Sequence, residues 1–178
     1  MKFEPTPIEG VWVVDIEPIE DDRGFFARAW CAREFTAHGL EASFVQENVA
    51  YSARAKTLRG LHFQREPVSE VKLVRCTTGA VWDVAVDLRP ASPTLNLWFG
   101  VSLTASKRNM LYVPEGCAHG YLSLEDASEV RYLTTQFYAP AAAFGARYDD
   151  PAFDIQWPSE VAVISEQDRR WPLVGDAA

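Results

Sequence analysis

Residues 57–64 read TLRGLHFQ and place an arginine and a histidine inside a segment that otherwise has the composition of a β-strand. Two later segments, KLVR at 72–75 and PEGCAHG at 114–120, add a lysine and a second histidine in similar surroundings. Charged groups on strands that enter a core must face solvent or line a pocket, because burying an unpaired charge is costly. The sequence therefore favours a proton-transfer site built on β-strands.

Strand-like runs separated by Gly, Pro and Ser turns surround this segment. They are expected at residues 11–16, 25–30, 44–49, 71–76, 80–88, 97–103, 110–113, 120–124 and 130–135. Strands at this spacing predict a β-sandwich or barrel. Within 80–88, Asp83, Ala85 and Asp87 alternate with apolar residues, which predicts a strand with one buried face. Short helices are expected only at 32–38, ending at Gly39, and at 165–170.

Composition excludes several classes of function. Seventeen basic and twenty-five acidic residues give a net charge of −8, so the average surface repels nucleic acid and anionic membranes. Cys31, Cys76 and Cys117 form an odd set without C-x-x-C spacing, which argues against a disulfide framework or a structural zinc site. The first residues contain no apolar stretch that would predict a signal peptide, and no window of about 18 apolar residues occurs. We expect one soluble cytoplasmic domain, residues 1–178.

Several side chains could carry chemistry. His62 is either a core histidine bonded to a backbone carbonyl or a general base, with Asp168 a candidate to orient it. Lys72 is either solvated on an outer face or stabilises an oxyanion in a pocket. Arg59 and Arg23 could hold phosphate, for which the guanidinium fork is suited. Tyr132, on a late strand, is either a packing group or a proton donor.

Metal and nucleotide-hydrolysis chemistry find no support in the motifs. Metal-binding barrels commonly use a His-x-His pair, but here His62 is followed by Phe63 and Gln64, and His38 lies in a distant predicted helix. His62 and His119 alone do not supply three nitrogen ligands. The chain also lacks a phosphate loop and a G-x-G-x-x-G fingerprint. Acid–base chemistry without a metal or other cofactor is therefore predicted.

A series of motifs occurs in order along the chain. They are DRGFF (22–26), FVQEN (44–48), LRGLHFQ (58–64), KLVR (72–75), DVAVDLR (83–89), SPT (92–94), PEGCAHG (114–120), YAP (138–140), DPA (150–152) and SEQD (165–168). From about residue 8 to Pro172 the chain closely resembles the dTDP-4-dehydrorhamnose 3,5-epimerase family. The resemblance implies an all-β, cupin-like jelly roll that forms a homodimer and binds a sugar nucleotide in the barrel mouth.

The resemblance also implies roles for individual residues. His62 matches the catalytic base, Tyr132 the catalytic acid, Lys72 the residue at the sugar's keto oxygen and Asp168 the partner of the base. Substrate-binding positions of the family match Arg23, Arg28, Gln46, Asn48, Arg59, His119 and Tyr138. In such a reaction the C4 ketone acidifies the hydrogens on C3 and C5. The base would remove one hydrogen, the lysine would stabilise the enolate, and the acid would reprotonate the opposite face.

Two positions depart from the family's pattern and leave alternatives open. Arg28 stands where a nucleotide-contacting glutamate is usual, and Ala143 stands where another glutamate is expected. A guanidinium only donates hydrogen bonds, whereas a carboxylate accepts them, so the nucleotide preference is open. The alternatives are an epimerase acting at C3 or C5 alone on a GDP- or CDP-linked sugar, a 3,4-ketoisomerase, and a non-catalytic sugar-nucleotide binding module.

Overall fold

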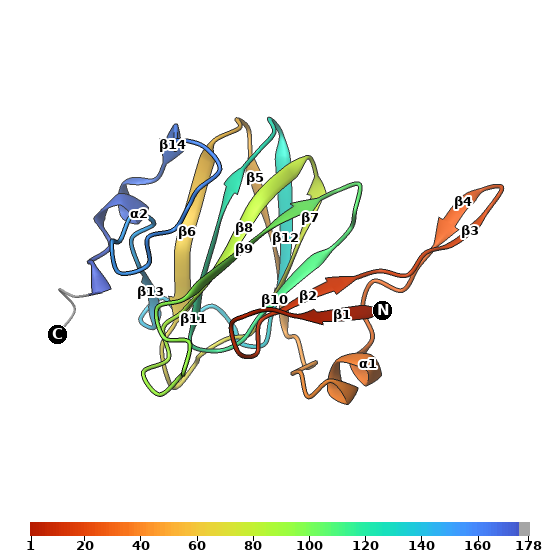
Figure 1. Cartoon of the computed structure of the whole chain (residues 1–178), viewed down its shortest axis with the longest axis horizontal. Helices are drawn as coiled ribbons and strands as arrows, with labels where there is room; N and C mark the ends of the chain where they lie inside the picture. The colour runs from red at the N-terminus through yellow and green to blue at the C-terminus, as the bar shows by residue number, and fades with distance from the viewer. Residues whose placement is uncertain (175–178) are drawn as a thin grey trace.

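The computed structural model describes residues 1–174, and two facing six-stranded β-sheets make up most of it (Figure 1). The first sheet has the order β1 (Lys2–Pro5), β2 (Trp12–Asp15), β10 (Met110–Val113), β7 (Lys72–Thr78), β12 (Ser128–Thr134) and β5 (Gln46–Ser52). The second has the order β13 (Ala143–Gly145), β6 (Thr57–Gln64), β11 (Cys117–Ser123), β8 (Ala80–Asp87) and β9 (Trp98–Thr104), with β14 (Val163–Ile164) also paired to β6. From β5 to β8 and again from β9 to β12, consecutive strands alternate between the sheets. The fold is the expected cupin-like jelly roll.

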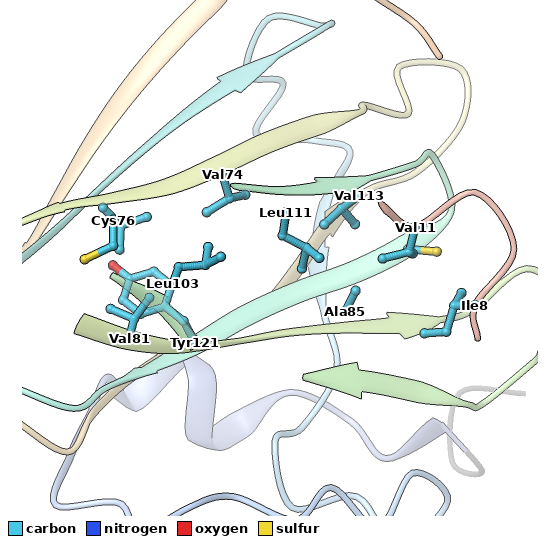
Figure 2. Packing of buried hydrophobic residues seen from close by; sticks show 12 residues of the cluster. Ile8, Val11, Val74, Cys76, Val81, Ala85, Leu103, Leu111, Val113 and Tyr121 are labelled. Carbon is cyan, nitrogen blue, oxygen red and sulfur yellow. The ribbon is translucent and has the colours of Figure 1, made fainter. Parts of the chain in front are cut away.

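The main core lies between the two sheets. The first sheet contributes Val74, Leu111 and Val130, and the second contributes Val81, Ala85, Leu103 and Tyr121, all of them buried. Figure 2 shows most of these side chains filling the space between the layers. Because apolar side chains from both sheets share this core, they hold the strands that carry polar groups at a fixed separation.

The helices are short, as the sequence predicts. Helix α1 (Ala32–Ala37) ends just before Gly39, whose φ of +72° suits glycine. Helix α2 (Glu166–Arg170) begins after Ser165, whose hydroxyl accepts a hydrogen bond from the Asp168 amide at 3.0 Å. Among residues 1–174 no helix is long and apolar enough to cross a membrane.

A hairpin of β3 (Ile19–Asp21) and β4 (Gly24–Phe26) projects from the body of the molecule (Figure 1). The strand predicted over 25–30 is wrong beyond Phe26, because the hairpin stands apart from both sheets and, within residues 1–174, no third strand extends its ladder. The predictions for 57–64 and 110–113 match β6 and β10 residue for residue, and the other predicted strands differ at their ends. Strands β1, β3, β13 and β14 were not predicted.

Strand β8 corrects the expectation of one buried face. Asp83 and Asp87 are both fully buried, so the polar side of the strand is covered as well. Asp83 is bound to His119 at 2.9 Å, and Asp87 accepts hydrogen bonds from Arg89, Ser92 and Thr94. Asp87 is satisfied by these partners, whereas Asp83 is paired through Oδ1 alone and its Oδ2 has no hydrogen-bond partner among residues 1–174. Because polar partners accompany both carboxylates into the interior, alternation in the sequence does not mean solvent exposure here.

At Gly60, strand β6 lies close against strand β11. The φ of Gly60 is +117°, and a Cβ atom built on it would lie 2.6 Å from Gly120 Cα and 2.8 Å from the His119 carbonyl oxygen. The register between the two strands shifts between His119 and Tyr121, beside this contact. A side chain at Gly60 would therefore force apart the backbones that carry both cavity histidines.

Replacing Gly60 by Ala should destabilise the fold strongly. We expect a loss of about 1–3 kcal/mol from backbone strain and a further loss of about 1–3 kcal/mol from overlap with β11. Gly39→Ala is the matched control, because Gly39 has a positive φ but open space around its Cα. Urea unfolding measures both variants, and equal losses would contradict the close-approach argument.

Candidate active site

A cavity of about 780 Å³ opens between the two sheets, lined by side chains from β5, β6, β7, β11, β12, β13, β14 and α2. Most of the predicted site residues meet there: His62, Lys72, Tyr132, Asp168, Gln46, Asn48, Arg59, His119 and Tyr138 all line it. The sequence could suggest each of these side chains separately. Their meeting in one cavity depends on strands that alternate between sheets.

His62 and Asp168 form a short side-chain contact in this cavity. His62 Nε2 lies 2.6 Å from Asp168 Oδ1, although 106 residues separate them in the chain. The His62 side chain is 47% exposed toward the cavity, whereas that of Asp168 is 6% exposed. The histidine is thus no core residue satisfied by a backbone carbonyl. A buried carboxylate fixes one ring nitrogen and leaves the other free to meet a ligand.

Asp168 is itself held by several donors. Besides His62, it accepts hydrogen bonds from the Gly60 amide at 3.3 Å and from Trp171 Nε1 at 3.3 Å. Burial alone would raise the pKa of Asp168, but the hydrogen bond and charge of His62, with the amide of Gly60, lower it below its ordinary value. The carboxylate therefore stays ionised beside the imidazole.

Lys72 and Tyr132 project from the opposite sheet. Lys72 is opposite Thr134 and Val74 is opposite Tyr132 in the β7–β12 register, so the lysine and the tyrosine share one face. The Lys72 side chain is only 8% exposed, which excludes a solvated lysine on an outer face. Tyr132 packs against the main core and also lines the cavity. Burial raises the pKa of Tyr132, and the charge of Glu70 raises it further.

Two further basic side chains, His119 on β11 and Arg59 on β6, lie near His62. His119 is opposite His62 in the β6–β11 register and is held by Asp83. Arg59 contacts Ser52 Oγ at 3.3 Å and the Tyr51 carbonyl oxygen at 2.7 Å. Strict alternation would put Arg59 and His62 on opposite faces, but both line the cavity because the ladder shifts register here.

The amide side chains and Tyr138 occupy another part of the cavity wall. Gln46 Nε2 donates to Asn48 Oδ1 at 2.9 Å, and the Tyr138 amide donates to Gln46 Oε1 at 3.3 Å. Tyr138 is 64% exposed, so a large part of its ring faces outward. An exposed aromatic ring at a cavity wall can stack on a planar ligand group.

Arg23 and Arg28 lie outside this cavity. Arg23 sits at the turn of the projecting hairpin, where its side chain is 88% exposed and pairs with Asp21. The Arg28 guanidinium lies 2.5 Å from the carboxylate of Glu34 and is 61% exposed. Ligand binding by these two arginines stays a prediction.

Sequence reasoning missed three groups in or beside the cavity. Glu70 pairs with Lys72 at 2.5 Å, Trp171 donates to Asp168, and Asp83 holds His119. Glu70 stands two residues before Lys72, and residues two apart in a strand point to the same face. This spacing could have indicated that the two side chains lie together. For Asp83, the alternation of polar and apolar residues in 80–88 predicted a solvent-facing side chain. Among residues 1–174 no three His, Cys, Asp or Glu side chains group to hold a metal ion.

Comparison with known proteins agrees with this geometry. The family model described as dTDP-4-dehydrorhamnose 3,5-epimerase matches residues 5–176. A dTDP-4-dehydrorhamnose 3,5-epimerase of Methanothermobacter thermautotrophicus is 43% identical over 96% of this chain and 92% of its own length. The chain belongs to the dTDP-4-dehydrorhamnose 3,5-epimerase family. It is therefore an isomerase of the epimerase type.

Two further relatives bear on the nucleotide that is bound and on which carbons are inverted. The crystal structure of a dTDP-4-dehydrorhamnose 3,5-epimerase from Bacillus anthracis with TDP and pyrophosphate bound has a TM-score of 0.93 and 38% identity, covering 97% of this chain and 99% of that one. A dTDP-4-dehydrorhamnose 3-epimerase of Streptomyces niveus is 36% identical over 99% of this chain and 86% of its own length. Relatives of both reaction types are thus similar to this chain.

Replacing Asp168 by Asn tests the electrostatics of the histidine pair. Because folding lowers the pKa of Asp168, its ionised form stabilises the fold above the ordinary value of 3.8, and this stabilisation is lost as the pH falls through the folded pKa. We expect wild type to exceed the variant by about 1–3 kcal/mol in unfolding free energy at pH 7. The difference should narrow below about pH 4. Urea unfolding at several pH values measures it, and a difference that widens on acidification would contradict the assignment.

Proposed function

We propose that this protein inverts C3 and C5 of a dTDP-linked 4-keto-6-deoxy sugar, of the dTDP-4-dehydro-6-deoxyglucose type, by proton transfer through an enolate. One observation carries the proposal. His62 on β6 and Tyr132 on β12 enter the same cavity from opposite sheets. A sugar ring between them presents one face to an imidazole and the other face to a phenol, and inversion at carbon requires this.

The proposed first step is proton removal next to the carbonyl. The C4 ketone makes the hydrogens on C3 and C5 acidic, and the free nitrogen of the His62 ring takes one of them. Asp168, bonded to the other ring nitrogen, stabilises the imidazolium that forms. The electron pair moves onto O4, and the Lys72 ammonium stabilises the resulting enolate.

The second step returns a proton to the opposite face. Tyr132 donates its phenolic proton to the same carbon, which leaves the configuration inverted. The buried surroundings that raise the pKa of Tyr132 keep it protonated near neutral pH, as an acid must be. The first inversion leaves a proton on His62 and a phenolate at Tyr132, so exchange with solvent must remove the one and reprotonate the other before the cycle restarts. The same two steps at the second carbon then give double epimerisation.

Binding of the nucleotide is assigned to the remaining cavity residues. Arg59 and His119 supply positive charge and N–H donors suited to a diphosphate. The exposed ring of Tyr138 suits stacking on a nucleobase, and Gln46 and Asn48 supply amide groups for hydrogen bonding. The similarity to the TDP-bound relative favours thymine as the base.

Inversion at C3 alone is the second candidate, favoured by the similarity to the Streptomyces niveus 3-epimerase. The same base, acid and lysine would serve either reaction, so the cavity residues do not decide between them. What differs is whether the ring can present C5 as well as C3 to His62.

Turnover in deuterated water distinguishes these candidates. We expect deuterium at both C3 and C5 of the dTDP-linked sugar, little turnover with the GDP- and CDP-linked forms, and loss of exchange by about 10²- to 10⁴-fold in His62→Ala. NMR locates the label, and dTDP affinity should stay nearly unchanged. Label at C3 alone would establish the second candidate. A carbonyl moved to C3 would indicate a ketoisomerase, and binding without exchange in wild type would indicate a non-catalytic module.

We also propose that the protein works as a homodimer in the cytoplasm and that residues 1–178 form one catalytic domain. The projecting hairpin supports the dimer, because Ile19 and Phe26 are 71% and 74% exposed on it. A lone two-stranded hairpin is marginally stable in water, so a partner subunit would stabilise it. The three free cysteines suit a reducing compartment.

In such a dimer the hairpin would carry Arg23 into the partner's cavity. Mixing Arg23→Ala subunits with His62→Ala subunits tests this. Each mixed dimer would then have one site with both wild-type residues, so about a quarter of wild-type activity should return from two nearly inactive parents. Refolding the variants together and measuring turnover checks it. No recovery, or a fully active monomer in sedimentation, would overturn the dimer proposal.

A further inference from the structure

Glu70 is an acidic side chain in the cavity that the proposed mechanism does not use. Its carboxylate lies 2.5 Å from Lys72 Nζ, and the two side chains are 11% and 8% exposed. Lys72 Nζ also lies 3.5 Å from the His62 carbonyl oxygen. The Lys72 ammonium is therefore held between the carboxylate of Glu70, two residues earlier in the chain, and the backbone of β6 in the facing sheet.

This pair is too buried to be an incidental surface contact. Exposed ion pairs contribute little because water screens them. Removing one partner of a buried pair leaves an uncompensated charge, which is strongly unfavourable. Glu70 therefore determines where the Lys72 ammonium lies, and a lysine side chain with four rotatable bonds has no such fixed position without a partner.

Glu70 also acts on Tyr132. Lys72 and Tyr132 are diagonal neighbours on one face of the β7–β12 ladder, so the carboxylate that binds Lys72 lies near the phenol. After burial, the charge of Glu70 is the next largest influence that raises the pKa of Tyr132, and Arg59 of β6 opposes it. The other titratable groups that line this cavity are Tyr121, Tyr138, His119, His62 and Asp168. Glu47, Arg75 and Arg131 form ion pairs on the outer side of the same sheet.

We propose that Glu70 is a positioning residue for the epimerase reaction, holding the Lys72 ammonium where the sugar's carbonyl oxygen binds and placing a negative charge that disfavours the phenolate of Tyr132. This inference rests on the proposed function. Its chemical consequence is a division of labour. Lys72 supplies positive charge at the enolate oxygen, while Glu70 prevents that same charge from drawing the proton off Tyr132.

Glu70→Gln removes the charge and keeps the size of the side chain. We expect the Tyr132 titration midpoint to fall by about one pH unit. The pH at which kcat declines on the alkaline side should fall by the same amount, and the affinity for dTDP should stay unchanged. Ultraviolet absorbance of tyrosinate measures the midpoint without substrate, after subtraction of the matching Tyr132→Phe protein. At neutral pH we expect kcat to fall about 10- to 100-fold, because Lys72 is no longer fixed.

Two further variants separate charge from position. Glu70→Asp keeps the charge but shortens the side chain, so the Tyr132 midpoint should stay near wild type while kcat falls. Glu47→Gln makes the same charge change on the outer side of the sheet, and it should alter neither quantity. If Glu70→Gln does not fold, Glu70→Asp still tests the proposal, because an unchanged kcat would show that the length of the side chain is irrelevant.

The outcomes distinguish this inference from the proposed function. If wild type exchanges no deuterium into any sugar nucleotide, the proposed function fails, while the absorbance titration still reports on Glu70 and Tyr132. If wild type is active and Glu70→Gln has an unchanged Tyr132 midpoint and pH profile, the role of Glu70 is overturned. A shift as large in Glu47→Gln would also overturn it, because the effect would then be one of net charge.

Discussion

The 2.6 Å contact between His62 and Asp168 is the interaction on which the site depends. It joins β6, which pairs with β11, β13 and β14 in the second sheet, to the short helix α2 near the end of the described chain. Ser165 caps that helix through the Asp168 amide, and Gly60 donates its own amide to the Asp168 carboxylate. Local helix capping, a glycine in the ladder and a long-range ion pair thus act together to fix one imidazole.

The second constraint is that the site residues are divided between two facing sheets. One sheet supplies the proposed base with His119 and Arg59, and the other supplies Lys72 and Tyr132. A core of mostly aliphatic side chains fills the space between the sheets (Figure 2) and so holds them apart. Close packing resists small displacements, so the space between imidazole and phenol is fixed before any ligand arrives. Such preorganisation is what proton transfer to opposite faces of one ring requires.

Much of this could be predicted from the sequence because strands and caps are local. The limits of β10 follow from its run of four apolar residues, those of β6 follow from apolar residues interspersed with polar ones, and Ser165 predicts the start of α2. Strand pairing is not local, and for that reason the burial of Asp83 and Asp87 could not be anticipated from alternation. The shared direction of Arg59 and His62 likewise depends on a register shift opposite Gly60. Glu70 was missed because its significance appears only once Lys72 points inward.

The central claim is that base and acid act on opposite faces of the sugar, and the Tyr132→Phe variant tests it most directly in deuterated water. With the phenol removed, the proposed base can still take a proton and return it to the same face. The account predicts substrate recovered with deuterium next to the carbonyl but with its configuration retained. Inverted product from this variant, or retention of every original hydrogen while His62 is intact and dTDP still binds, would contradict it.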